Sequence, residues 1–149
     1  MQFAIAANDS KPALSHYRMT WTPQCTQDGS FTFFSTEFGE AFHSDLGAKA
    51  EAFEKFALAT DLPQKAQKPS ICLLDVCYGL GYNTAAALET IWSINPTCYI
   101  EVYGLELDST VPVGALTPEI LNPWSTSVQV ILQCLALNQS CQQDHLDAH

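Results

Sequence analysis

The segment from Asp75 to Asn83, with the sequence DVCYGLGYN, has the residue types of a ligand-binding turn. Gly79 and Gly81 follow an apolar run and precede a helix-favouring run, so we expect them in a turn between a strand and a helix. A residue without a Cβ lets a ligand approach the backbone and lets the chain adopt unusual φ angles. Such turns also occur without a ligand, so the glycines alone leave a binding site and a structural turn equally open.

Two acids near this turn narrow the choice of ligand. Asp75 stands four residues before Gly79, where a dinucleotide-binding fingerprint usually has an apolar residue, and Thr84 stands where that fingerprint has a third glycine. A carboxylate here would stabilise an ammonium group and repel a pyrophosphate. Glu106 ends the next predicted strand, where an acid can accept hydrogen bonds from both ribose hydroxyls. The simpler alternatives are a capping carboxylate for Asp75 and a solvated strand end for Glu106. The presence of both acids favours a ligand with an ammonium and a ribose.

These residues belong to a predicted strand–helix–strand unit. The apolar run 71–76 is bounded by turn residues and is typical of a buried parallel strand. A helix is expected from residue 83 to about 94, where an Asn-Pro pair ends it, and a second strand over 99–107. A strand, a glycine turn, a helix and a strand form a βαβ unit. The sequence therefore predicts an α/β fold with a Rossmann-like parallel sheet.

The residues before this unit predict a β-hairpin and a helix. Residues 18–26 and 31–35 are rich in Thr, Phe and Trp, and the Asp28-Gly29 pair between them favours a tight turn. Ser44 would cap a helix over about 45–60, and a polar linker with two prolines would follow over 61–70. We therefore divide the chain into an N-terminal extension, 1–69, and a parallel-sheet part, 70–149.

Less regular structure is expected after Asp108. Three prolines, at 112, 118 and 123, break any long element. Residues 127–137 predict an amphipathic helix, and residues 138–149 a polar tail with no strand pattern. The buried face of that helix would carry Val128, Ile131, Leu132 and Leu135.

Composition limits the possible partners. The chain has 149 residues, of which 47% are hydrophobic, enough for one globular domain. Sixteen acids against six basic residues give a net charge of −10, which repels the phosphate backbone of nucleic acid. Arg18 is the only arginine and no basic stripe is found, so any contact with RNA would be local.

The cysteines and the N-terminus indicate a cytoplasmic protein without a metal site. None of the six cysteines forms a CxxC pair, and no histidine lies at ligand spacing from Cys72 and Cys77. The N-terminus lacks the features of a secretory signal, and no stretch is long enough to span a bilayer. We therefore expect reduced, mostly buried thiols rather than a disulfide framework.

The glycine segment and the residues before it resemble a known family. Asp75 to Thr84 looks like motif I of the class I S-adenosylmethionine-dependent methyltransferases, with Cys77 in the place often held by the first glycine. The region before motif I in MnmC-like members of that class is similar to residues 28–52 of this chain. Together the similar segments lie within about residues 20–108, and they include Asp28-Gly29-Ser30, Glu37-Phe38-Gly39-Glu40, His43-Ser44 and Gly47-Ala48.

This resemblance implies roles for several residues. Glu106 would bind the ribose of S-adenosylmethionine. Glu51 and His43 would line the same pocket from the N-terminal segment. Structural roles are equally good interpretations, with Glu51 as an exposed helix carboxylate and His43 as a hydrogen-bonded loop histidine. The methionine end of the cofactor would be surrounded by Asp75, Gly79, Gly81 and Asn83.

The resemblance also implies a reaction and partners. In the MnmC-like family this domain methylates the aminomethyl group on the wobble 2-thiouridine of certain tRNAs, which yields 5-methylaminomethyl-2-thiouridine. It is sometimes fused to an FAD-dependent oxidoreductase that prepares the substrate, so tRNA and such an enzyme are the implied partners. The family's later strands carry an acid near the adenine and an Asp-Pro-Phe-like motif, and neither is found here. We expect a class I sheet that is truncated relative to the family, without an assignable catalytic residue.

Two other classes of function stay open. An incomplete sheet has an unpaired edge, which suits a non-catalytic binding or assembly module, or self-association. A fragment of an NAD(P)- or FAD-linked oxidoreductase is disfavoured by Asp75 and Thr84, for the reasons given above.

Overall fold

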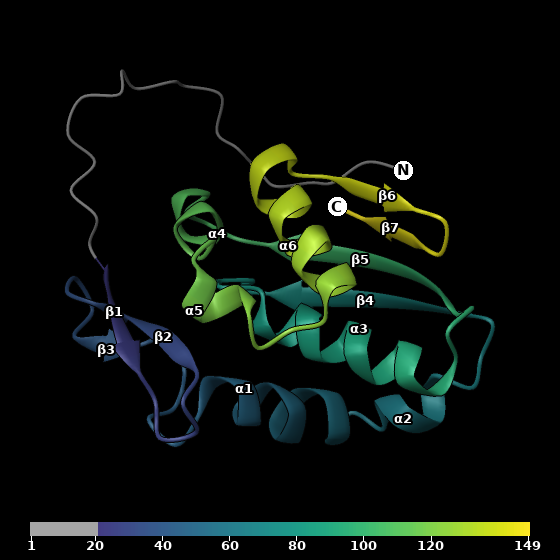
Figure 1. Cartoon of the computed structure of the whole chain (residues 1–149), viewed down its shortest axis with the longest axis horizontal. Helices are drawn as coiled ribbons and strands as arrows, with labels where there is room; N and C mark the ends of the chain where they lie inside the picture. The colour runs from purple at the N-terminus through teal and green to yellow at the C-terminus, as the bar shows by residue number, and fades with distance from the viewer. Residues whose placement is uncertain (1–20) are drawn as a thin grey trace.

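The computed structural model describes residues 21–149. Its N-terminal part is a three-stranded antiparallel sheet, drawn at the left of Figure 1. The predicted hairpin is confirmed, because Cys25 pairs with Phe31 across a turn in which Gly29 has a φ of 82°. Residues 18–20 of that prediction lie outside the described residues. The strands are β1 (Trp21–Cys25), β2 (Phe31–Ser35) and β3 (Glu40–Ala41).

The helix after this small sheet begins at residue 48 rather than at about 45 as predicted. The hairpin turn supplies its caps, since the Lys49 N–H donates to Ser30 Oγ at 3.1 Å and the Ala50 N–H donates to Asp28 Oδ2 at 3.0 Å. Tertiary contact therefore fixes where the helix begins, and a local cap does not. The elements are α1 (Ala48–Glu51), which continues as the π-helix η1 (Ala52–Leu58), and then α2 (Leu62–Lys65), within the predicted linker.

The predicted strand–helix–strand unit is confirmed. Its two strands are parallel, with Ser70 opposite Tyr99 and Val76 opposite Leu105. The connecting helix packs a buried alanine run, 85–87, into the core, and it lies in front of the sheet in Figure 1. The carboxyl ends of both strands thus reach the same edge of the sheet, beside the glycine turn. The elements are β4 (Ser70–Val76), α3 (Tyr82–Ile94) and β5 (Tyr99–Leu105).

Three helices follow β5, and the last of them contacts α3. The predicted amphipathic helix is confirmed, with the four expected apolar side chains buried. The prolines at 112 and 118 lie inside two short helices, and the proline at 123 precedes the long one. The elements are α4 (Thr110–Gly114), α5 (Pro118–Leu121) and α6 (Thr126–Asn138).

The C-terminal tail is not irregular, so this prediction was wrong. It forms a hairpin whose second strand runs parallel to β5, and the His145 carbonyl accepts the Ile100 N–H at 2.9 Å. Leu146 and Ala148 are fully buried, but a strand of three residues is too short for its alternation to be recognised in a sequence. The sheet order is β4–β5–β7–β6, with β6 (Cys141–Gln143) and β7 (Leu146–Ala148).

Among residues 21–149, helices cover only one face of this four-stranded sheet. Along β4, Ile71 and Leu73 are half-buried on the helix side, whereas Leu74 and Val76 are 66% and 59% exposed on the other side. The predicted parallel strand is present, but the expectation that it is buried was wrong for this side. The strand reads as a continuous apolar run, yet it stands at the end of the sheet. No helix or strand of residues 21–149 covers the side that carries Leu74 and Val76, which we call the bare face.

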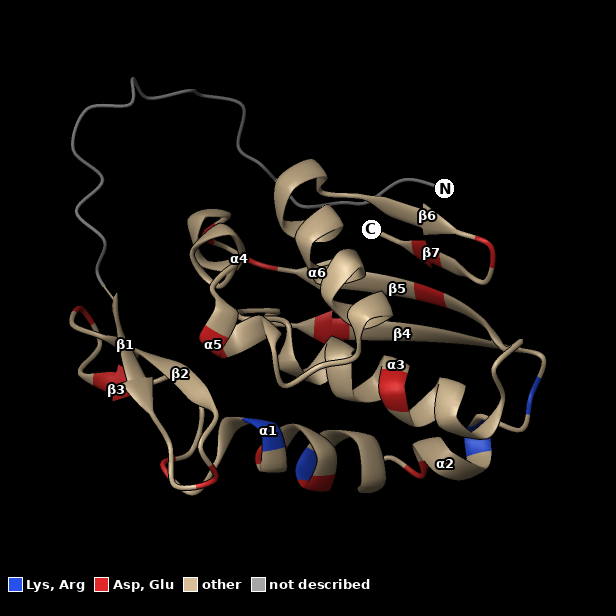
Figure 2. Cartoon of the chain, in the orientation of Figure 1, with Lys and Arg blue, Asp and Glu red and all other residues tan. Residues whose placement is uncertain are grey.

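One hydrophobic core joins the two parts of the chain. Trp21 and Phe33 of the small sheet belong to the same cluster as Ile100 and Ile131. The predicted division at residue 69 coincides with the start of β4, and the core runs across it. In Figure 2 the lysines lie on and around the N-terminal helices, while acids are spread over both sheets. No helix within residues 21–149 is long and apolar enough to cross a membrane.

Candidate functional site

The turn between β4 and α3 has an unusual backbone. Cys77, Gly79 and Gly81 have φ angles of 61°, 57° and 80°, all in the left-handed region. Glycine adopts this region freely, whereas a side chain there is strained. Cys77 stands where the resembling motif usually has glycine, and its backbone shows why glycine suits that position. The turn reverses the chain tightly enough to bring backbone N–H groups to the carboxyl end of the sheet.

Glu106 is held directly beside this turn. Its Oε2 accepts the Gly79 N–H at 2.8 Å, and its Oε1 accepts the Asp108 N–H at 3.0 Å. The carboxylate is thereby fixed where β5 ends, half-buried and next to the glycine turn. Each carboxylate oxygen keeps further acceptor capacity, because it has more than one lone-pair site.

Asp75 lies at the end of β4 and is tied to the start of α3. The Thr84 hydroxyl donates to Asp75 Oδ2 at 2.7 Å. Burial raises the pKa of Asp75 above its ordinary value, and the nearby charge of Glu106 raises it further. Hydrogen bonds from Thr84 and Asn83 act in the opposite direction without cancelling this rise. Two carboxylates thus sit at neighbouring strand ends, where a cation would relieve their repulsion.

A pocket opens between the glycine turn and the N-terminal segment. Its volume is about 200 Å³. Aromatic side chains, a histidine, an acid and the turn itself form its wall, so both parts of the chain contribute. We call this the turn pocket, and it is lined by Phe42, His43, Glu51, Phe56, Val76, Cys77, Tyr78, Gly79 and Asn83.

Asn83 offers an unused acceptor in this wall. Its Oδ1 is buried and has no hydrogen-bond partner among residues 21–149. A buried carbonyl oxygen without a partner costs roughly 1–3 kcal/mol. Asn83 also lines a second hollow, which it shares with Asp75. An ammonium group placed here would satisfy the Asn83 oxygen close to the Asp75 carboxylate.

His43 and Glu51 enter the turn pocket from the N-terminal segment, as the resemblance implies. The Thr32 hydroxyl lies 2.9 Å from His43 Nδ1, and the imidazole ring packs edge-on against Tyr82. Burial lowers the pKa of His43, although the charge of Glu51 opposes this. The imidazole is therefore neutral at pH 7.

Glu51 is held by two donors. The Ser44 N–H donates to Glu51 Oε2 at 2.6 Å, and Lys55 Nζ lies 2.7 Å from Oε1. Ser44 was predicted to cap the helix, but the helix begins at residue 48 and Ser44 does not cap it. Burial raises the pKa of Glu51, but the hydrogen bonds from Lys55 and Ser44 outweigh it and the net shift is downward. The carboxylate stays ionised and orders the loop that carries His43.

Gly81 does not line the turn pocket. A Cβ built on it would lie 2.6 Å from the Tyr78 hydroxyl and 2.9 Å from Leu132. Its space is thus taken by side chains, whereas a Cβ on Gly79 would meet its nearest atoms at 3.6 Å. Gly79, Asn83 and Glu51 meet in one pocket. Asp75 lines the second hollow beside Asn83, and Glu106 lines a third hollow beside Tyr78 and Gly104. Sequence reasoning missed Tyr78, Phe42 and Phe56 as wall residues, and no sequence pattern would have identified them.

Within residues 21–149 no group of three or more His, Cys, Asp or Glu side chains is placed to hold an ion. All six cysteines lie among these residues and none is in a disulfide.

Comparisons with known proteins agree with the resemblance found in the sequence. No family model matches the chain. The crystal structure of MnmC2 from Aquifex aeolicus matches with a TM-score of 0.71 and 28% sequence identity, over 86% of this chain and 40% of that chain. An uncharacterized protein of Methanocaldococcus jannaschii is 40% identical over 64 residues, which are 43% of this chain and 17% of that protein.

The structural match confirms both the resemblance to the MnmC-like methyltransferases and the partial α/β fold. The chain spans about two fifths of the solved MnmC2 chain that it matches.

Proposed function

We propose that this chain binds S-adenosylmethionine at the turn pocket and is related in function to MnmC2-type methyltransferases. One observation carries the proposal. Asp75 and Glu106 stand at the ends of adjacent parallel strands, and the backbone of the glycine turn joins them through Gly79. Ligands of open α/β sheets bind outside the carboxyl ends of the strands. The two carboxylates suit a ligand that carries an ammonium and a ribose, and they disfavour a pyrophosphate.

The residues present fit the cofactor. Asn83 Oδ1 and Asp75 would accept hydrogen bonds from its ammonium group, since one is a buried oxygen without a partner and the other a carboxylate. Glu106 would accept from the ribose hydroxyls with its remaining lone pairs. Gly79 leaves the room that a side chain would fill.

For methyl transfer, these residues would mainly need to bind the cofactor and position it. S-adenosylmethionine supplies an activated methyl group on a sulfonium, so the reaction needs a neutral acceptor held in line with it. The neutral His43 imidazole and the aromatic wall of the turn pocket keep that region partly apolar. By similarity to MnmC2, the proposed acceptor is the aminomethyl group of a wobble 2-thiouridine in tRNA, prepared by an FAD-dependent oxidoreductase.

Titration calorimetry tests the cofactor proposal with S-adenosylhomocysteine, S-adenosylmethionine and NAD. We expect both methionine-derived ligands to bind more tightly than NAD. Asp75→Asn should weaken S-adenosylhomocysteine at least tenfold, because a buried charge-assisted hydrogen bond contributes about 1.5–3 kcal/mol. Asp144→Asn, at an exposed position in the β6–β7 turn, is the matched control and should bind as the parent does. Tighter binding of NAD would instead support a dinucleotide-binding protein.

A non-catalytic assembly module is the second candidate, and the bare sheet face favours it. Leu74 and Val76 would lie in water unless something covers them. The two candidate sites adjoin at Val76, which lines the turn pocket and is also exposed on the bare face.

A further inference from the structure

Two cysteines come together where α6 ends and β6 begins. Cys134 lies in the C-terminal half of α6, and Cys141 is the first residue of β6. Between them Gln139 has a φ of 58°, in the left-handed region, and its N–H donates to the Leu135 carbonyl at 2.8 Å. A residue in this conformation ends a helix and turns the chain back. In Figure 1 the chain passes from the upper end of α6 directly into β6.

The two thiols interact directly. The Cys134 thiol donates to the carbonyl of Ser140 at 3.3 Å, and Ser140 immediately precedes Cys141. Burial and a hydrogen bond to the Cys134 thiol raise the pKa of Cys141 to about 12. Cys141 is only 4% exposed, whereas Cys134 is half-buried, so a reagent in solution reaches Cys134 first. We call Cys134 and Cys141 the thiol pair.

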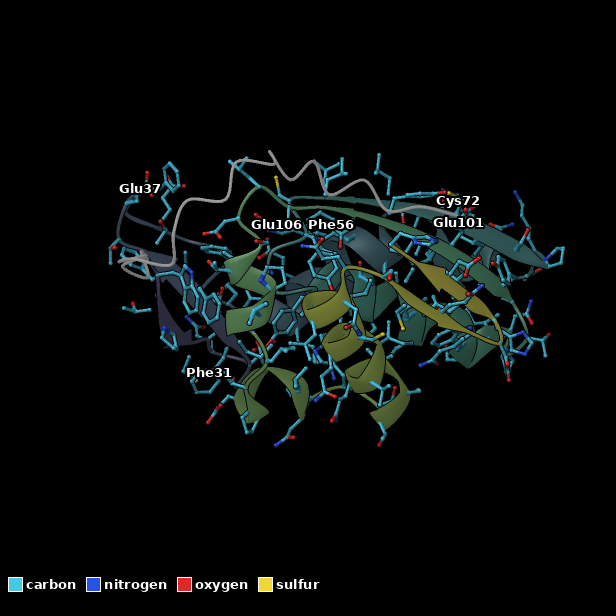
Figure 3. The ribbon with its side chains drawn as sticks, turned by 90° about the horizontal axis from the view of Figure 1, so that it is seen from above. Phe31, Glu37, Phe56, Cys72, Glu101 and Glu106 are labelled. Atoms are coloured by element: carbon cyan, nitrogen blue, oxygen red, sulfur yellow. The ribbon has the colours of Figure 1, made fainter. Side chains whose placement is uncertain are left out.

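The other four cysteines have no hydrogen bond to a second thiol among residues 21–149. Cys25 and Cys98 donate to backbone carbonyl groups next to them in the sequence. Cys72 and Cys77 are exposed, the first on β4 and the second in the glycine turn. Figure 3 shows Cys72 on the side of the sheet away from the helices. The thiol pair is therefore the one that the folded chain can join with the least movement.

The thiol pair brackets a segment that forms part of the third hollow. Leu135, Ala136 and Gln139 lie between the two cysteines and line this hollow beside Glu106. Strand β6 ends the sheet and pairs with β7 over only three residue pairs. A short strand with few backbone hydrogen bonds opens readily by local unfolding. A covalent link between α6 and β6 would restrain both this strand and the wall of the hollow.

We propose that the thiol pair is a reversible redox device, in which a disulfide between Cys134 and Cys141 ties β6 to the end of α6. The inference goes beyond cofactor binding, and it stands or falls separately from the function proposed for the turn pocket.

The oxidant would be a small-molecule disulfide such as oxidised glutathione. Cys134 loses its proton and attacks one sulfur of the oxidant, which forms a mixed disulfide and releases one glutathione thiol carrying that proton. The Cys141 sulfur then attacks the Cys134 sulfur and breaks the mixed disulfide, and the second glutathione thiol leaves with the Cys141 proton. Two cysteine thiols are thereby oxidised to a disulfide, and one glutathione disulfide is reduced to two thiols.

Thiol mapping tests the proposal. The purified chain is equilibrated with mixtures of oxidised and reduced glutathione, quenched in acid and alkylated, and then analysed by mass spectrometry before and after chymotrypsin digestion. The intact chain should lose the mass of two hydrogen atoms, and the link should join Cys134 to Cys141. Dithiothreitol should reverse it. Mixed disulfides alone, or a link between other cysteines, would overturn the proposal.

A matched pair of variants locates the reaction. Cys134→Ser, a change of similar size at a half-buried position, should lose the disulfide completely. Cys72→Ser is the control, because Cys72 is exposed and lies on the other side of the sheet, and it should form the disulfide as the parent does. Equal disulfide formation in the two variants would contradict the assignment.

A second measurement asks whether the link restrains the fold. Oxidation should raise the melting temperature of the parent by about 3 °C or more, because the disulfide removes freedom from the unfolded chain. The Gln139 amide, inside the closed loop, should exchange hydrogen at least threefold more slowly. Cys134→Ser in the same glutathione mixture should show neither change. A disulfide that formed but left both quantities unchanged would show that the thiol pair is no structural device.

Discussion

Glu106 Oε2 accepts the Gly79 N–H at 2.8 Å, so the carboxylate that would bind a ribose is held by the turn that would bind the methionine end. We predict that Glu106→Ala lowers S-adenosylhomocysteine affinity at least tenfold, because a hydrogen bond to a charged acceptor contributes about 1.5–3 kcal/mol. Methionine alone, which has no ribose, should lose less. Calorimetry with both ligands measures the difference.

The control for this variant is Glu119→Ala on α5, which removes an exposed carboxylate that lines neither the turn pocket nor the hollows beside Asp75 and Glu106. It should leave both affinities within twofold of the parent. If Glu106→Ala weakened methionine as much as S-adenosylhomocysteine, Glu106 would act by shaping the turn, and its assignment to the ribose would be wrong.

Asp75 should stabilise a ligand at a cost to the fold. Burial raises its pKa, and a carboxyl whose pKa is higher in the folded than in the unfolded state destabilises the fold as it ionises. Stability from this group is complete below the unfolded pKa and declines as pH rises through the folded pKa. We therefore predict that Asp75→Asn melts at pH 7 at the same temperature as the parent or higher, while its ligand affinity falls.

Melting curves of the parent and Asp75→Asn at pH 4 and pH 7 check the sign of this stability difference. The gap in favour of Asp75→Asn should be larger at pH 7, where the parent carboxyl is ionised. A variant that is less stable than the parent at both pH values would show that Asp75 is a structural carboxylate, tied to Thr84 for the sake of the fold.

The convergence of Asp75 and Glu106 could be predicted from the sequence. Two apolar runs separated by a helix indicate parallel strands, and the carboxyl ends of parallel strands meet at one edge of the sheet. The hairpin was equally accessible, since the pair Asp28-Gly29 determines both turn and register. In each case the signal is local, or follows from one rule of topology.

Features that depend on tertiary contact could not be predicted. Strand β7 exists because β5 offers it hydrogen bonds, and its three residues carry no recognisable period. The start of α1 is fixed by Ser30 and Asp28 of the hairpin, which lie about twenty residues upstream of the N–H groups they cap. The wall of the turn pocket likewise comes from segments that only the fold brings together.

Cys77 should be a strained position. Its φ of 61° is in the left-handed region, which costs an L-residue roughly 1–2 kcal/mol. Glycine avoids that cost but loses more entropy on folding, so Cys77→Gly should stabilise the protein by about 0.5–1 kcal/mol net. Urea unfolding measures it. Cys72→Gly is the matched control, because Cys72 is an exposed cysteine in extended β4, and there the same change should destabilise.

Asp28 should make stability depend on acid pH. Burial raises its pKa, but hydrogen bonds from Ser30, Ala50 and Thr26 outweigh this and lower it to about 2. A lowered pKa contributes stability above the unfolded value, and that stability is lost as pH falls from about 4 toward 2. Since Asp28 is exposed, we discount the effect and expect Asp28→Asn to cost about 1 kcal/mol at pH 7.

At pH 2.5 the parent and Asp28→Asn should have nearly converged, because most of the pH-dependent advantage of the parent is gone. Thermal melts at both pH values give the comparison, and Asp144→Asn, in the exposed β6–β7 turn, should track the parent throughout. A difference between parent and Asp28→Asn that did not depend on pH would mean that the charge of Asp28 does not matter to the helix cap.

The two glycines of the turn should separate stability from binding. A Cβ on Gly81, where φ is 80°, would press on Tyr78 and Leu132, so Gly81→Ala should cost about 2–3 kcal/mol. A Cβ on Gly79 meets nothing closer than 3.6 Å, so Gly79→Ala should cost only about 1 kcal/mol from its φ of 57°. Its methyl group would nevertheless point at Phe42 in the turn pocket and should weaken S-adenosylhomocysteine binding.

Urea unfolding of both variants measures the loss of stability, and calorimetry measures the loss of ligand affinity. Gly79→Ala should be the folded variant that binds poorly, and Gly81→Ala the variant whose loss of binding follows from its loss of stability. Refolded at low temperature in stabilising salt, Gly81→Ala should recover affinity, because its glycine does not line the pocket, whereas Gly79→Ala should not. Full affinity in Gly79→Ala would place the ligand elsewhere, because a methyl group added to the wall of an occupied pocket must contact the ligand and change its affinity.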